Sequence, residues 1–383
     1  MRELTFLMIA GLVVVPAADA QHEAFIGASE QCEFAAGLAL TEEWRYAPPE
    51  TSPADRLFAM PSSVARHPQA GVYVVDALGP AVLHLSLDGE FIRRIGRSGE
   101  GPGEFQVPTI VRATDHGFAV YDQFAGISFF DTGGGFQRIV RFQTFPSSAR
   151  DFRILENGDL VLAGAVSSSD HALHVYSPEG EYLGGMGQVR MDLEEPILRA
   201  RYNNGLIAET GTGRLAYARP VPFEFLLFED SELTVTVAHA DILHDYVREV
   251  ATPLEGGGWK FAWRHPGLSS FARLPDGCFL AAVGRLPEDV EDILLETTDF
   301  YTELVFLSDQ GSVLHRQTLS FYFRPLEVWR DPGGRVHLLG TGRDKATGLN
   351  FPIQYLAVPF EGPAPVASNA AFAPPLPRRI PGS

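Results

Sequence analysis

The chain has 383 residues, and its 30 lysines and arginines against 48 aspartates and glutamates give a formal charge of −18. This acidity excludes nucleic acid and anionic membrane surfaces as expected partners, because both recruit basic faces. Hydrophobic residues make up 45% of the chain and charged residues 20%, while 38 glycines, 28 prolines and 27 phenylalanines favour a globular all-β fold with many tight turns.

Residues 1–20 have the features of a secretory signal peptide. The basic Arg2 precedes an apolar run over residues 4–15, and Ala18, Asp19 and Ala20 form a small-residue cleavage site. The run is shorter than the ~20 residues that a membrane-spanning helix needs. We therefore expect cleavage after Ala20, a secreted or periplasmic location, and no membrane span.

Cys32 and Cys278 are the two cysteines of the chain. In an oxidising compartment they can pair across a long loop or remain two thiols, and the sequence leaves both alternatives open. The absence of a Cys-x-x-Cys motif excludes a thiolate zinc site and a thioredoxin-type redox centre.

A repeat of about fifty residues organises the chain between residues 60 and 360. In its first copy, strands are predicted at residues 62–65, 72–75, 81–87 and 91–95. The glycine of the first hairpin recurs six times, at Gly71, Gly117, Gly158, Gly213, Gly277 and Gly334. Six copies of a four-stranded unit predict an all-β fold, a six-bladed β-propeller.

The sixth copy ends near residue 360 after three strands, which would leave the ring with open edges. Residues 37–46 alternate in polarity, so we predict that this N-terminal strand closes the last blade. The propeller then spans residues 21–360, and the proline-rich residues 361–383 are expected to form a flexible tail.

The segment GRSGEGPGEF at residues 96–105 follows the strand sequences VYVVD and LSLDGEFIRRIG. This combination resembles the six-bladed β-propeller proteins of the NHL-like superfamily found among exported bacterial proteins, with its specific part over residues 60–145. The motif's glycines permit a sharp turn, and Phe105 is expected to anchor the loop between two blades. The resemblance implies a broad range of functions, which includes calcium-dependent lactonases, lyases and binding modules, so the fold does not settle the activity.

Arginines gather at or beside the starts of the predicted inner strands, namely Arg150, Arg153, Arg201, Arg264 and Arg324. Arginine recognises carboxylates and phosphates through two parallel hydrogen bonds, so convergence of these residues predicts an anion-binding channel mouth. The alternative is that each arginine pairs with an acidic side chain. The predicted ligand-binding residues are Arg150, Asp151, Arg201, Tyr202, Asn203, Arg264, Arg324 and Glu327.

A lactonase-type site would need several oxygen ligands for calcium around the axis. The inner strands offer only Asp151, Asn203 or Asn204, and Glu327 at suitable positions, so we predict no bound cofactor. The segment HADILHD at residues 239–245 is interpreted as a solvated loop, because its two histidines are five positions apart and do not share a helical face.

Two further sets of polar residues are assigned structural roles. Asp76 and Asp122 end the second strands of two repeats, where an aspartate typically caps the next turn. The chain has no G-x-S-x-G nucleophile elbow, so the serines near the inner strands, Ser63, Ser269 and Ser270, are interpreted as ordinary strand or turn residues.

The function predicted from the sequence is therefore a non-catalytic one, in which an exported propeller binds a small anionic ligand, a glycan or an envelope protein at its channel mouth. Two alternatives remain open. One is a metal-dependent hydrolase, lactonase or lyase that uses the same face, with calcium as the metal. The other is a structural cell-envelope scaffold.

Overall fold

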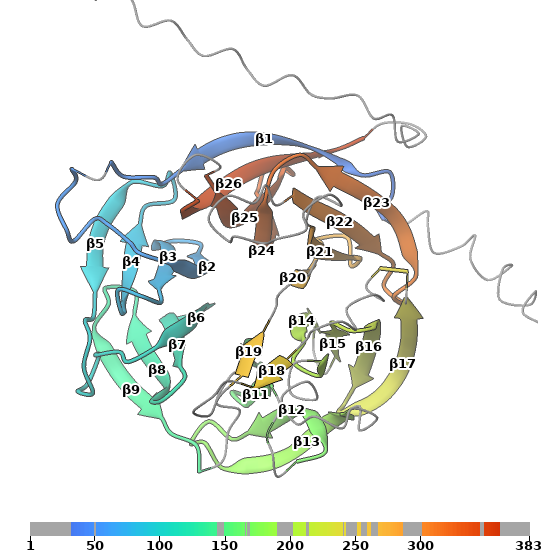
Figure 1. Cartoon of the computed structure of the whole chain (residues 1–383), viewed down its shortest axis with the longest axis horizontal. Helices are drawn as coiled ribbons and strands as arrows, with labels where there is room; N and C mark the ends of the chain where they lie inside the picture. The colour runs from blue at the N-terminus through green and yellow to red at the C-terminus, as the bar shows by residue number, and fades with distance from the viewer. Residues whose placement is uncertain are drawn as a thin grey trace, which may run out of the picture.

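The computed structural model describes residues 32–49, 51–143, 149–164, 166, 169–189, 202–211, 214–239, 241–242, 251–253, 259–261, 267–285, 301–344 and 348–360. Within these ranges the chain forms six four-stranded antiparallel sheets, arranged as blades in a ring (Figure 1). The predicted fold class, an all-β six-bladed propeller, is confirmed. None of the described residues belongs to a helix with the length and apolar character needed to cross a membrane.

Each blade runs outward from its first strand. Blade one contains β2 (Pro61–His67), β3 (Gly71–Asp76), β4 (Ala81–Leu85) and β5 (Phe91–Ile95). Blade two contains β6 (Pro108–Thr114), β7 (Gly117–Asp122), β8 (Gly126–Asp131) and β9 (Phe136–Val140). Blade three contains β10 (Asp151–Ile154), β11 (Leu160–Ala163), β12 (His171–Tyr176) and β13 (Tyr182–Gln188).

The second half of the ring carries the insertions. Blade four contains β14 (Leu206–Gly211), β15 (Arg214–Arg219), β16 (Phe223–Glu229) and β17 (Glu232–His239). Blade five contains β20 (Gly267–Arg273), β21 (Phe279–Arg285), β22 (Tyr301–Leu307) and β23 (Val313–Leu319). Blade six contains β24 (Phe323–Arg330), β25 (Val336–Arg343), β26 (Asn350–Pro359) and β1 (Leu38–Arg45). A separate hairpin, β18 (Ala251–Pro253) and β19 (Trp259–Phe261), lies between blades four and five in sequence and is seen within the outline of the ring in the view of Figure 1.

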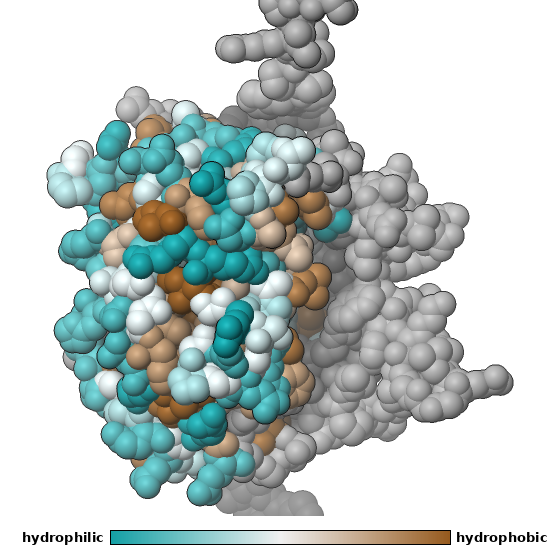
Figure 2. All heavy atoms as spheres, turned by 90° about the vertical axis from the view of Figure 1, so that its left-hand side faces the viewer, coloured by the Kyte–Doolittle hydropathy of each residue, from teal (hydrophilic) through white to brown (hydrophobic). Residues whose placement is uncertain are grey.

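Burial explains the composition of the strands. Every residue of β3, β4 and β7 is buried, because these middle strands have a neighbouring blade on each side. The outer strands β5 and β9 expose the middle of their sequences, FIRRI and FQRIV. Figure 2 shows this side of the ring as largely hydrophilic, with apolar spots separated by polar side chains.

The glycine-rich segment at residues 96–105 ends in a side chain that packs between blades one and two. Phe105 is fully buried, and its ring centroid lies 5.7 Å from that of Phe130. Phe130 in turn stacks on Phe118 at 4.9 Å, and Phe118 stacks on Tyr73 of blade one at 4.1 Å. The anchoring role predicted for Phe105 is therefore confirmed.

Two of the recurring hairpin glycines show why no other residue fits there. Gly71 and Gly117 have φ angles of +122° and +157°. A Cβ added to either glycine would lie 2.1 Å from a carbonyl oxygen, that of Leu85 or Phe130 respectively. Gly213, the fourth member of the series, lies outside the described residues.

The N-terminal strand closes the ring. The last sheet has the order β1-β26-β25-β24, and β1 pairs antiparallel with β26 from Leu38 opposite Pro359 to Arg45 opposite Ile353. Glu43 of β1 also accepts a hydrogen bond from Gln354 Nε2 at 2.8 Å. β1 therefore occupies the outer position of blade six, as predicted for residues 37–46. The predicted signal peptide and C-terminal tail lie outside the described residues, so the domain limits stay predictions.

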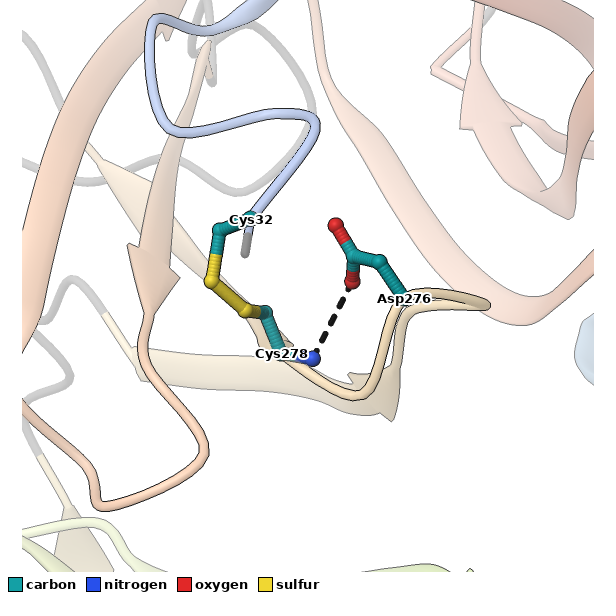
Figure 3. Close-up of side chains that lie close together, drawn as sticks. All are labelled: Cys32, Asp276 and Cys278. Carbon is teal, nitrogen blue, oxygen red and sulfur yellow. Dashed lines mark hydrogen bonds between the residues drawn. A yellow bond between two sulfur atoms is a disulfide. The ribbon is translucent and has the colours of Figure 1, made fainter. Parts of the chain in front are cut away.

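Cys32 and Cys278 form a disulfide with a Cα–Cα distance of 6.0 Å, which decides between the two alternatives that the sequence left open (Figure 3). Asp276 lies beside it, where its carboxylate accepts hydrogen bonds from the backbone N–H groups of Glu33 at 2.7 Å and Cys278 at 3.1 Å. These three side chains are the one cluster of metal-ligand type among the described residues, and the disulfide engages both sulfur atoms. The cluster therefore joins the segment before β1 to blade five.

Candidate functional site

The first strands of the blades, β2, β6, β10, β14, β20 and β24, line the centre of the ring (Figure 1). Four of them have a register shift near their start, which inserts one extra residue opposite the second strand. The extra residues are Ser62, Thr109, Ser269 and Leu326. Because a β-bulge changes which side chains face a given direction, these shifts decide what enters the channel.

The starts of the inner strands enclose a narrow cavity of about 20 Å³. This volume is close to what one or two water molecules need. Its charged lining residues are Arg112, Arg150, Asp151, Arg153 and Arg324. Four cations and one anion therefore meet here, within a chain whose formal charge is −18.

Arg150 and Arg324 lie near each other at this cavity, where both donate hydrogen bonds to backbone carbonyl oxygens of blade five. Arg150 Nη2 donates to the Leu268 oxygen at 2.8 Å, and Arg324 Nε donates to the Ser269 oxygen at 2.7 Å. Arg324 Nη1 also donates to the Ser62 oxygen of blade one at 3.0 Å. Neither guanidinium forms a salt bridge with a carboxylate of the described residues.

Burial has the largest effect on the pKa of each of these two arginines. It lowers the pKa of Arg324, and burial together with repulsion from Arg324 lowers the pKa of Arg150 to about 10. Both guanidinium groups still carry their charge at neutral pH. Each has five N–H donors, of which the bonds above use one in Arg150 and two in Arg324, so spare donors remain at the cavity.

Asp151 is held between two other arginines and is not available to a ligand. Its Oδ1 accepts hydrogen bonds from Arg153 Nη1 at 2.8 Å and from Arg112 Nη2, while its Oδ2 accepts from the backbone N–H of Ile207 at 3.0 Å. Burial by itself would raise the pKa of Asp151, but Arg112 and Arg153 outweigh it, and the pKa lies below its ordinary value. Asp151 therefore ties blades two, three and four together.

A wider cavity of about 330 Å³ lies further along the inner strands and shares Arg112, Arg153 and Leu326 with the narrow one. Its carboxylates are Glu209 of β14 and Glu327 of β24. Neither carboxylate has a hydrogen bond or salt bridge to another side chain or backbone group in the described ranges. Burial raises the pKa of Glu327, against the opposing influence of Arg112 and Arg153.

Two hydroxyl groups at the narrow cavity, those of Thr109 and Ser270, have no hydrogen-bond partner in the part of the chain that the structure describes. The Ser270 residue is only 2% exposed. A buried polar group without a partner costs about 1–3 kcal/mol, so such groups usually have an ordered water or a ligand. Both hydroxyls therefore point to an occupant of the channel.

The structure describes six of the eight predicted site residues. Arg150, Asp151 and Arg324 meet at the narrow cavity, and Glu327 lines the wider one. Tyr202 and Asn203 line neither. Tyr202 packs against the core shared by blades four and five, and the Asn203 carbonyl oxygen accepts a hydrogen bond from the Tyr217 hydroxyl at 2.5 Å. The other two predicted residues, Arg201 and Arg264, lie outside the described ranges.

Sequence reasoning did not single out Arg112 and Glu209, and it treated Ser270 as an ordinary strand residue. In a regular strand, alternation would show which side chains share a face. The register shifts of β6 and β20 interrupt that alternation. The only available signal was charge in otherwise apolar inner strands, as in PTIVRAT for Arg112 and LIAETG for Glu209.

The other polar residues have structural roles where the structure describes them. Asp76 accepts hydrogen bonds from the backbone N–H groups of Met60 and Gly79, and Asp122 accepts equivalent bonds from Gln106 and Phe124, so both cap turns as predicted. In the HADILHD segment, Nε2 of His239 pairs with the Gly311 oxygen at 2.7 Å and Asp241 pairs with Arg316. The second half of that segment, His244 and Asp245, lies outside the described residues.

No protein-family model matches the chain, and no curated protein sequence matches it. Among solved structures, an exported protein of Bacteroides fragilis has 11% identity and a TM-score of 0.53, over 83% of this chain and 95% of that one. A member of the DUF4221 family from Bacteroides vulgatus has 8% identity and a TM-score of 0.51, over 83% and 97%. At such low identity these likenesses support the propeller fold alone.

Proposed function

We propose that the protein is an exported, non-catalytic β-propeller that binds a small anionic ligand in its central channel. The observation that carries this proposal is the pair of partly buried arginines, Arg150 and Arg324, which line the narrow cavity and have no carboxylate partner among the described residues. The N–H donors that they do not use match an oxyanion, because the planar guanidinium recognises carboxylate and phosphate oxygens in pairs. The unpartnered hydroxyl of Ser270 adds a third donor at the same place.

The size of the two cavities indicates how such a ligand would sit. The narrow cavity has room for the charged group only, whereas the adjoining cavity of about 330 Å³ is within the size range of small-molecule sites. A ligand would therefore place its anionic end between Arg150 and Arg324 and its remaining atoms among Arg112, Arg153 and Glu327.

The hydrolase or lyase alternative has less support from the described residues. Of the oxygen ligands that the sequence suggested for calcium, Asp151 is already bound to two arginines and a backbone amide, and neither Asn203 nor Asn204 lines either cavity. Glu327 is the one candidate from that set that lines a cavity and has no hydrogen bond or salt bridge among the described residues. The described side chains therefore favour an anion over a calcium ion.

A thermal-shift screen tests the proposal. The probes are acetate, succinate, citrate, galacturonate, phosphate and sulfate, and calorimetry then gives the Kd of the most stabilising one. A charge-assisted hydrogen bond contributes about 1.5–3 kcal/mol, so Arg150→Gln and Arg324→Gln should each weaken that probe roughly ten- to a hundredfold. The matched control is Arg97→Gln, whose side chain is 81% exposed outside the channel.

Two results would contradict the proposal. One is equal affinity of wild type and both channel variants for the best probe. The other is loss of binding after passage over a chelating resin, which would favour the metal-dependent alternative. The resin is preferable to a dissolved chelator, because that is itself a polycarboxylate.

Export is the second part of the proposal and rests on residues 1–20. Protein recovered from an exporting host should begin at Gln21, as measured by intact mass and N-terminal sequencing. A recovered chain that retains residues 4–15 would contradict it.

A further inference from the structure

The two cavities of the channel differ in the hydrogen-bonding groups that have no partner among the described residues. At the narrow cavity they are donors, the spare N–H groups of Arg150 and Arg324 and the Ser270 hydroxyl. At the wider cavity they are acceptors, the carboxylates of Glu209 and Glu327, which have no partner among the described residues.

The arginines of the wider cavity do not neutralise these carboxylates through hydrogen bonds. Arg112 directs its three nitrogens to the carbonyl oxygens of Phe152 and Val111 and to Asp151. Arg153 bonds to Asp151 and to the carbonyl oxygens of Phe152 and Ile207.

The third arginine at this cavity, Arg273, is exposed at the end of β20. Its Nη2 lies 3.6 Å from the position that a Cβ would take at Gly277, in the turn between β20 and β21. Its guanidinium therefore lies beside that turn. The carboxylates of Glu209 and Glu327 thus remain available to a ligand in the wider cavity.

The distance between the donors of the narrow cavity and the acceptors of the wider one can be taken from β24, because this inner strand carries one residue of each kind. Arg324 and Glu327 lie three positions apart on β24, with the extra residue Leu326 between them. A strand rises about 3.3 Å per residue, so the two side chains start roughly 7–10 Å apart along the channel. An α-amino acid, whose charges flank a single carbon, is too short to reach both ends.

We infer that the channel ligand is a zwitterion of peptide-like length, with its carboxylate between Arg150 and Arg324 and its ammonium group at Glu327 and Glu209. This inference rests on the proposed function and adds the second, cationic end of the ligand. Three extended residues span at most about 10 Å, so an unbranched tripeptide with free termini has a suitable length.

Three matched probes test the inference by calorimetry on the full mature chain. Triglycine carries both charges, N-acetyl-triglycine lacks the ammonium group, and triglycine amide lacks the carboxylate. Because each terminal charge makes a charge-assisted contact, triglycine should bind at least tenfold more tightly than either derivative.

A single substitution in the channel tests which residue contacts the ammonium group of triglycine. Glu327→Gln should weaken triglycine about tenfold and leave N-acetyl-triglycine unchanged, which a general loss of structure would not do. Glu209→Gln serves the same purpose if the first variant does not fold. The control is Glu90→Gln, the same chemical change at an exposed position outside the channel.

The outcomes separate this inference from the anion-binding proposal. If triglycine and N-acetyl-triglycine bind equally and Arg324→Gln weakens both, the anion site stands and the zwitterion inference is overturned. If neither peptide binds while a small anion from the screen does, the inference is again overturned. If no probe of either set binds, both proposals fail.

Discussion

Cys32 and Cys278 lie 246 positions apart in the chain and are joined by a disulfide that fixes the segment before β1 to blade five. The same segment continues into β1, which completes blade six. The N-terminal part of the propeller is therefore attached to two neighbouring blades, once covalently and once through backbone hydrogen bonds.

Removal of the disulfide should destabilise the protein. A native disulfide typically contributes about 2–5 kcal/mol, chiefly by restricting the unfolded chain. We expect the double variant Cys32→Ser with Cys278→Ser to lose a free energy of unfolding in that range, measured by urea titration under oxidising conditions. Wild type with a reductant should behave like the variant, and an unchanged midpoint in both would contradict the expectation.

Deletion of the closing strand should cost far more than deletion of the C-terminal tail. Without residues 37–46, β26 loses its partner along the whole register from Ile353 to Pro359 and becomes an open edge. We expect a melting temperature lower by more than about 10 °C and a tendency to aggregate. Deletion of residues 363–383 is the control, and similar melting temperatures for the two truncations would refute the closure argument.

Replacement of Asp151 should be among the most destabilising single changes in the channel. Asp151→Asn leaves Arg112 and Arg153 buried without their shared counter-ion, which typically costs about 3–5 kcal/mol. Because the folded-state pKa of Asp151 is below its ordinary value, this stabilisation is present above roughly pH 4 and declines as the pH falls through the folded-state pKa.

The measurement for Asp151 is a series of urea titrations between pH 8 and pH 3. The control is Asp115→Asn, at an exposed turn between β6 and β7. A difference between Asp151→Asn and wild type that is no larger than that of the control would argue against the counter-ion role.

Replacement of Glu327 should have the opposite effect on stability. Its pKa is raised in the folded state, so at neutral pH the charged carboxylate is less stable there than in the unfolded chain. Glu327→Gln should therefore raise the melting temperature by roughly 2 °C at pH 7.5 in the absence of ligand. The gain should vanish below the pKa of an unfolded glutamate, about 4.3, where both states carry the proton. A constant gain at pH 7.5 and pH 4 would show that ionisation is not its cause.

The fold could be predicted from the amino-acid sequence, because it depends on local patterns that repeat along the chain. Short alternating strands, hairpin glycines such as Gly71 and Gly117, and an unpaired last blade are all visible along the chain. The closing strand follows from the last of these, since a ring with three strands in its final blade would leave an edge exposed. The disulfide remained undecided at that level, because pairing depends on the approach of two residues from opposite ends of the chain.

Which charged side chains bind one another depends on the tertiary structure. Arg150 reaches a carbonyl oxygen of blade five, and Asp151 is bound by arginines of blades two and three, contacts that span up to 118 positions. The register shifts of the inner strands also change which side chains enter the channel. Residues at the starts of different blades converge because each inner strand lines the same axis, and the repeat predicted this for Arg150 and Arg324. The local register shifts and the hydrogen-bond partner of each side chain are not encoded in the spacing of residues along the chain.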